Sequence, residues 1–165
     1  MLRISTARRV ADTFWPEFVE RDGVILLPQV HPPEPPPGRH HRTVTEYERF
    51  HGHTHFQDLF RWDVPMRHDP EWDLDVPDSD SPQHAAAWQL TQRIARMWLA
   101  KLMLDFPAYR FRVYASRLVD PIIHFHRVRE GEPMWIRDEE AVEQQARGDI
   151  VVLDSGARPP HVAAR

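Results

Sequence analysis

The strongest pattern of hydrophobic and polar positions in this chain is helical and runs from Pro82 to Phe106. Ser81 is a good N-cap, Pro82 suits the first helical position, and Pro107 ends the pattern. Apolar residues recur there at three- and four-residue steps and cover a broad arc: Ala87, Trp88, Leu90, Ile94, Ala95, Met97, Trp98, Leu102 and Leu104. The sequence therefore predicts a long helix whose apolar side packs against a sheet.

Strand patterns flank this helix on both sides. Before it, Phe18–Pro28 carries an Asp22-Gly23 turn or bulge followed by the apolar run Val24–Leu27, which is typical of a strand buried on both faces. Periodicity and turn signals after Pro107 predict four more elements. These are the strands Arg110–Ser116 and Ile122–Arg129, a helix Asp138–Ala146 ended by Gly148, and a last strand Ile150–Leu153.

This order predicts a single α+β domain over residues 1–165, with an insertion over 31–80 and a frayed tail over 156–165. Without the insertion, the order β, long α, β, β, α, β is that of a ferredoxin-like fold, with an antiparallel sheet and both helices on one face. Alternation assigns one sheet face to the helices: Phe111, Val113, Ala115, Ile123 and Phe125. The open face then receives Arg110, Arg112, Tyr114, His124 and His126.

The insertion contains three different patterns. His31–Gly38 is rich in proline and predicts a stiff extended loop. Thr43–Phe60 has moderate helical periodicity, although Gly52 costs about 1 kcal/mol within a helix and favours a break near the histidines. Trp62–Asp80 contains Pro65, Pro70 and Pro77 and predicts a loop.

Composition narrows the classes of function. Hydrophobic residues make up 41% and charged residues 28% of the 165, as in ordinary globular domains, and the formal net charge is −4. The negative charge argues against nucleic-acid and anionic-membrane binding, and the absence of cysteine excludes disulfides, thiolate nucleophiles and thiolate-bound metals. No run approaches the roughly 20 apolar residues of a membrane span. We expect a cytoplasmic bacterial protein without a cofactor.

Histidines supply most of the candidate chemistry. His51, His53 and His55 would share one face on a strand, whereas on a helix only His51 and His55 would. Their pattern lacks the Glu beside the first His that helical zinc proteases use as general base, because Gly52 stands there. His124 and His126 share one face of a predicted strand.

These histidines are candidates for two kinds of site. Acid/base chemistry would use His53, His55, His124 and His126, whereas a divalent transition metal such as zinc would take its ligands from the larger set of His51, His53, His55, His124 and His126. The alternative is a hydrogen-bonded polar cluster with no chemistry. The Thr43–Phe60 helix is the only amphipathic element left to cover the open sheet face. We therefore expect His53 or His55 to lie near His124 or His126, with at least one pKa depressed by mutual repulsion.

An acidic run occupies Asp69–Asp80, with six acids, no base and one tryptophan. It lacks the glycine and the closing glutamate of a calcium loop. Its tryptophan and negative charge suit docking onto a basic protein partner, although a solvated loop would have the same composition. The predicted contact residues are Trp72, Asp73, Asp75, Asp78 and Asp80.

Two hypotheses of function follow. The first is a small binding module, similar in role to immunity or inhibitor proteins, that docks a basic partner through the acidic run. The second is a metal-dependent or histidine-based enzyme that acts on a small molecule between the 43–60 helix and the open sheet face. The chain contains no G-x-S-x-G motif and no phosphate-binding glycine loop, so neither serine-hydrolase nor nucleotide chemistry is indicated.

Overall fold

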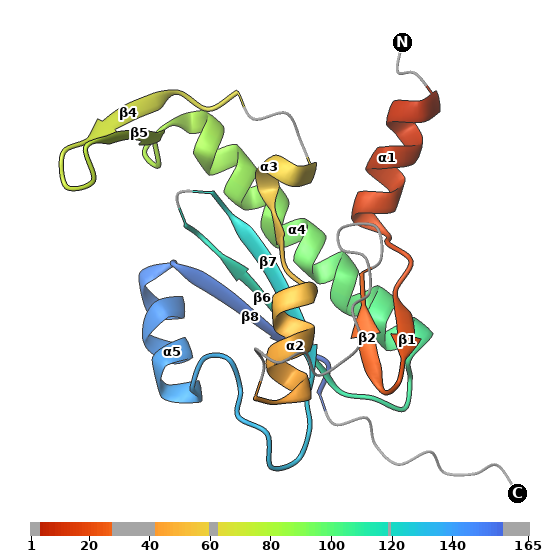
Figure 1. Ribbon diagram of the computed structural model, residues 1–165. Coiled ribbons are helices and arrows are strands. Elements are labelled where there is room, and N and C mark those ends of the chain that lie inside the picture. The colour runs from red at the N-terminus through yellow and green to blue at the C-terminus, as the bar shows by residue number, and fades with distance from the viewer. Residues whose placement is uncertain (1–3, 28–41, 60–62, 119, 157–165) are drawn as a thin grey trace, which may run out of the picture.

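A four-stranded antiparallel sheet forms the centre of the computed structural model, which describes residues 4–27, 42–59, 63–118 and 120–156 (Figure 1). Its strand order is β3-β7-β6-β8. The strands are β3 (Thr54–His55), β6 (Phe111–Ser116), β7 (Ile122–Arg127) and β8 (Ile150–Asp154). Val113 of β6 pairs with Phe125 of β7 and with Leu153 of β8, so these three side chains share one face. The chain is therefore a mixed α+β domain built on antiparallel pairing.

The long helix α4 (Pro82–Asp105) covers this face of the sheet. Its N-cap is Ser81, whose side chain accepts a hydrogen bond from the backbone N–H of His84 at 3.1 Å, as predicted. The core against the sheet joins helix residues Trp88, Ile94, Ala95, Trp98 and Leu102 to strand residues Phe111, Val113, Ala115, Ile123 and Phe125. The predicted assignment of these strand residues to the helix side is confirmed. Leu104 was wrongly placed in the apolar arc, because it is 67% exposed.

The second predicted helix, α5 (Asp138–Arg147), packs on the opposite sheet face. A small core there contains Tyr114, Ile136, Ala141 and Ile150. The helix ends where Gly148 adopts a left-handed conformation with φ 78°, as a C-terminal glycine commonly does. A ferredoxin-like fold places both helices on one face, so this arrangement does not confirm that prediction.

The segment expected as the first sheet strand forms a separate hairpin of β1 (Val19–Arg21) and β2 (Val24–Leu26). Asp22 and Gly23 have φ values of 51° and 78°, which are the conformations that a tight two-residue hairpin turn requires. The predicted burial on two sides is confirmed. Ile25 and Leu27 join the α4 core, while Val24 and Leu26 pack with Tyr47.

The predicted helix over Thr43–Phe60 is interrupted after its first half. It divides into α2 (Val44–His51), strand β3 and the short helix α3 (Phe56–Leu59), and Gly52 is the C-cap of α2. The predicted loop over Trp62–Asp80 contains instead a hairpin of β4 (Met66–Asp69) and β5 (Leu74–Pro77). Alternation of Leu74 and Val76 with acids is a strand pattern, which the prolines obscured.

Two predicted segments lie wholly or mostly outside the described residues, and one helix precedes the first hairpin. An amphipathic helix, α1 (Ile4–Phe14), precedes β1. The proline-rich segment 31–38 and nearly all of the tail over 156–165 lie outside the described residues. Among the helices that are described, none has the length and apolar character needed to cross a membrane.

Candidate functional site

Helix α2 is held against β7 by a buried carboxylate, Glu48. Arg129 donates to both of its oxygens, from Nη1 to Oε2 at 2.7 Å and from Nη2 to Oε1 at 2.6 Å. The backbone N–H groups of Ile25 and Arg127 also donate to this carboxylate, each at 2.8 Å. Because a buried charge is tolerated only when it is paired and hydrogen-bonded, these contacts fix the position of α2 relative to β2 and β7.

Gly52 allows the end of α2 to approach the sheet closely. A Cβ atom at this position would lie 2.7 Å from Cε1 of Phe125 and 2.6 Å from the carbonyl oxygen of Glu48. Both distances are shorter than atoms tolerate, so no larger residue fits without movement. His53, which follows Gly52, is consequently brought close to His124 of β7.

His53 and His124 meet at this point, as the sequence analysis expected. Their ring centroids are 5.7 Å apart, and the ring of His55 lies 5.5 Å from that of His53. His53 Nδ1 is hydrogen-bonded to the carbonyl oxygen of Phe50, which accepts. The indole of Trp135 also packs against His124, with 4.3 Å between ring centroids. Segments distant in sequence therefore contribute imidazoles to one cluster, which we call the histidine cluster (His53, His55 and His124).

His124 is the most perturbed member of the histidine cluster. Burial lowers its pKa to about 3, and the positive charges of His53 and Arg49 act in the same direction. The Arg49 guanidinium also lies 5.4 Å from the ring centroid of Trp135. Nδ1 of His124 has no hydrogen-bond partner within the part of the chain that the structure describes. At neutral pH this imidazole is therefore uncharged.

His55 forms a pair with Asp120 at the opposite end of the cluster. Nδ1 of His55 lies 2.9 Å from Oδ2 of Asp120, and the backbone N–H of Gln57 donates to the other carboxylate oxygen at 3.3 Å. Burial raises the pKa of Asp120, whereas the Gln57 and His55 contacts oppose this shift. With Nδ1–H donated to the carboxylate, Nε2 of His55 carries a lone pair. In the neutral imidazole this is the tautomer of a general base, and the side chain is 33% exposed.

The other two candidate histidines lie elsewhere. The ring of His51 packs 4.3 Å from that of Tyr47, and His126 is fully buried beside Tyr114. His126 Nδ1 must donate to the Arg127 carbonyl at 3.1 Å, so its Nε2 accepts from the Tyr114 hydroxyl at 3.3 Å. Burial lowers the pKa of His126. Among the described residues, no three His, Asp or Glu side chains form a group that could hold a metal ion, so the predicted five-histidine metal site receives no support.

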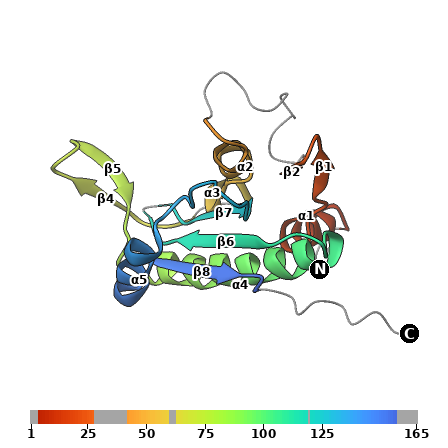
Figure 2. The same cartoon turned by 90° about the horizontal axis from the view of Figure 1, so that it is seen from below.

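Most of the acidic run lies on the hairpin β4–β5, which projects from the body of the domain (Figures 1 and 2). Trp72 is 69% exposed near its tip, and the adjacent Asp73 has a φ of 49°. Asp75 pairs across the hairpin with His68. Asp78 and Asp80 lie instead at its base, where Oδ1 of Asp78 accepts from the Asp80 N–H at 3.1 Å. The five predicted contact residues therefore divide into a tip set and a base set.

Sequence reasoning missed Glu48 and Arg49. Glu48 lies four residues after Val44 and next to Tyr47, on the side of α2 that packs inward. A carboxylate on the apolar side of a helix is a signal for a buried ion pair. Arg49 carries no such signal, because its proximity to Trp135 depends on the path of the chain after β7.

Neither a model of a known protein family, nor a curated protein, nor a solved structure matches this chain. Any inference of function therefore depends on the residues described above.

Proposed function

We propose that this protein is a binding module that docks a basic protein partner through the hairpin β4–β5, in the manner of an immunity or inhibitor protein. The observation that carries the proposal is the exposure of Trp72 on a projecting acidic hairpin. Met66 and Leu74 are exposed on the same hairpin. Tryptophan is enriched among the residues that contribute most to protein interfaces, and burying its large apolar surface is favourable in free energy.

The fold of the hairpin supports the same proposal. Its two strands pair only with each other among the strands described, and an isolated two-stranded hairpin is marginally stable in water. A partner that packs on it would bury the apolar side chains and complete the layer. The acids of the tip, Asp73 and Asp75, would accelerate encounter with a positively charged surface.

Photo-crosslinking in cells tests the proposal. A photoreactive amino acid is placed at position 72 or, as a matched control, at Val142 of α5, which is also exposed and apolar. A basic protein captured from position 72 alone is then purified, and its affinity is measured with wild type, Trp72→Ala and Val142→Ala. We expect Trp72→Ala to weaken binding by about 2 kcal/mol or more and Val142→Ala to leave it unchanged.

The charge component is tested with the same purified partner. Replacing Asp73 and Asp75 with asparagine should slow association and flatten its salt dependence, with little change in thermal stability. Equal crosslinking from both positions, or affinity that is unchanged in Trp72→Ala, would remove the hairpin from the interface and contradict the proposal.

The Asp120–His55 pair favours a second candidate, a histidine-based enzyme that acts on a small molecule. The carboxylate holds His55 in the tautomer that accepts a proton at Nε2, which is how oriented histidines act as general bases. Hydrolysis of p-nitrophenyl acetate is a suitable general probe. The rate should fall at least about tenfold in His55→Gln and in Asp120→Asn, whereas His68→Gln on the exposed hairpin should match wild type. Equal rates in all four proteins would argue against this candidate.

A further inference from the structure

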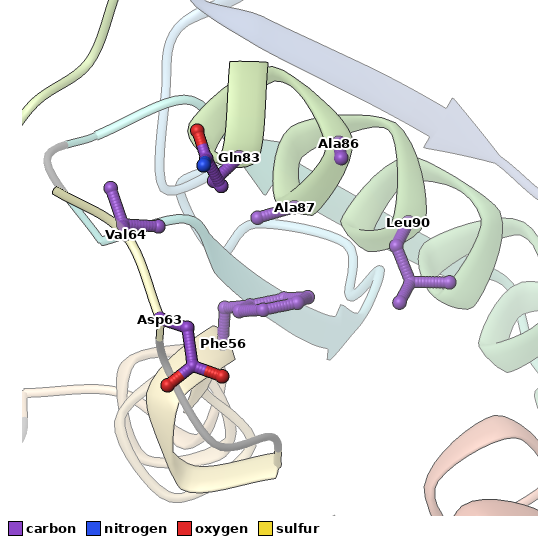
Figure 3. Close-up of a pocket in the computed structure, with 7 residues that line it drawn as sticks. All are labelled: Phe56, Asp63, Val64, Gln83, Ala86, Ala87 and Leu90. Atoms are coloured by element: carbon purple, nitrogen blue, oxygen red, sulfur yellow. The ribbon is translucent and has the colours of Figure 1, made fainter. Parts of the chain in front are cut away.

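A pocket of about 260 Å³ lies between the segment after β3 and the first turns of α4 (Figure 3). Figure 3 shows the ring of Phe56 facing Ala87 and Leu90 of α4 across this space, with Val64 and Gln83 at one end. Its walls are mainly apolar. Pockets for drug-sized molecules are commonly about 300–1,000 Å³. This pocket is smaller and suits a single side chain.

The packing behind Phe56 leaves the pocket adaptable. Phe56 separates it from an internal void that is lined by Thr54, Thr91 and Ile94 and is too small for a water molecule. Oγ1 of Thr54 is buried there, and none of the described residues accepts from it or donates to it. A phenyl ring with a void behind it loses contacts on that side, so it can adjust to a group that enters from the front.

The pocket is continuous with the base of the hairpin β4–β5. Val64 leads into β4, and Gln83 follows β5 by a short connection. The N–H of Asp78 donates to the carbonyl of Pro65 at 2.7 Å, which closes the hairpin base beside the pocket. A partner bound along the hairpin would therefore reach the pocket without leaving the surface.

The charged side chain among the described residues that line the pocket is acidic. Asp63 lines it, and Asp78 and Asp80 lie on the connection that joins the hairpin to α4. One base is close to this connection, because Nη2 of Arg117 donates to the Ser79 carbonyl at 3.4 Å. The balance favours a cationic group next to whatever enters the pocket.

We infer that this pocket receives an apolar side chain, such as leucine, that is flanked by arginine or lysine in the basic partner docked by the hairpin. The inference rests on the proposed docking function and adds a second anchor to it. Residues that contribute most to an interface commonly fill well-packed pockets, and this pocket at the hairpin base would add such a contact to that of Trp72 near the tip. The acids around it would select the flanking bases.

Two short peptides serve as probes, Ac-Arg-Leu-Arg-NH₂ and Ac-Glu-Leu-Glu-NH₂, with methyl-labelled leucine NMR of the protein as the readout. We expect the arginine peptide to shift the Leu90 methyl signals and to bind at least about threefold more tightly than the glutamate peptide. Ala86 lines the pocket from an exposed position, so Ala86→Trp should fill it and weaken binding about tenfold, or ~1.4 kcal/mol. Ala100→Trp, at another exposed alanine of α4, is the matched control and should bind as wild type.

Thermal melts of both tryptophan variants establish that they fold. If Ala86→Trp does not fold, Gln83→Trp fills the pocket from a second exposed position and replaces it in the test. No shift of Leu90 with either peptide would overturn the inference, and so would equal binding of the two peptides. Crosslinking from position 72 tests the hairpin separately. If the hairpin fails and the arginine peptide still binds, the pocket remains a binding site and only the docking proposal is lost.

Discussion

The histidine cluster predicts a loss of stability in mild acid that one substitution should remove. His124 has a pKa of about 3 in the folded protein, against an ordinary value of 6.5. The unfolded chain therefore binds a proton at this residue between pH 6.5 and pH 3, while the folded protein does not. Because the unfolded state binds more protons in that window, stability is complete above pH 6.5 and falls as the pH is lowered toward 3.

The magnitude follows from the difference between the two pKa values. One pKa unit is worth 1.36 kcal/mol, so at pH 5 the contribution of His124 is a loss of about 2 kcal/mol relative to pH 7. Substitution of His124 by glutamine keeps a polar side chain and removes the titration. The free energy of unfolding of this variant should change by ~2 kcal/mol less than that of wild type between pH 7 and pH 5.

Urea unfolding followed by circular dichroism at both pH values measures this difference. His68→Gln, on the exposed hairpin, controls for removing any histidine and should retain the dependence of wild type. Only the change between the two pH values is compared, so a uniform loss of stability in either variant does not affect the result. If His124→Gln and wild type lose the same free energy on acidification, the buried, neutral state assigned to His124 is wrong.

Three further predictions concern stability, and urea melts measure each of them. Glu48→Ala removes the carboxylate that pairs with Arg129, whose side chain is only 13% exposed, and should cost about 3–5 kcal/mol. Gly52→Ala places a methyl group against the ring of Phe125 and should cost about 1–3 kcal/mol despite the better helix propensity of alanine. Ile94→Ala leaves a cavity beneath α4 and should cost about 2–5 kcal/mol, whereas Leu104→Ala on the exposed side should stay within ~0.5 kcal/mol.

The elements with regular periodicity could be predicted from the sequence. Helix α4 begins and ends where Ser81 and Pro107 indicated, and the alternation of β6 correctly separated Phe111, Val113 and Ala115 from Tyr114. These features depend on local geometry that a short window of sequence determines. The exposure of Leu104 shows the limit of that reasoning, because Leu102 in the same turn is fully buried while the equally apolar Leu104 is not.

Pairing between distant segments was harder to predict. Asp22-Gly23 was recognised as a turn or bulge, but a hairpin and a single bulged strand have the same local sequence. Whether the segment forms a hairpin or one bulged strand depends on which other strand pairs with its edge. In this fold β3, and not β2, pairs with β7, because Thr54 and His55 lie opposite Ile123 and Ile122. Strand β3 has only two residues, which is too short for a residue pattern that would predict this pairing.

The meeting of His53 with His124 was predictable for a reason unrelated to histidine chemistry. Two imidazoles do not attract each other, and protonation of either one would repel its neighbour and Arg49. Their position is instead determined by the Glu48–Arg129 pair, which anchors α2, and by Gly52, which permits contact with Phe125. The cluster is therefore held together by neighbouring interactions that outweigh its own repulsion. Mild acid should therefore act on this layer of the fold through His124.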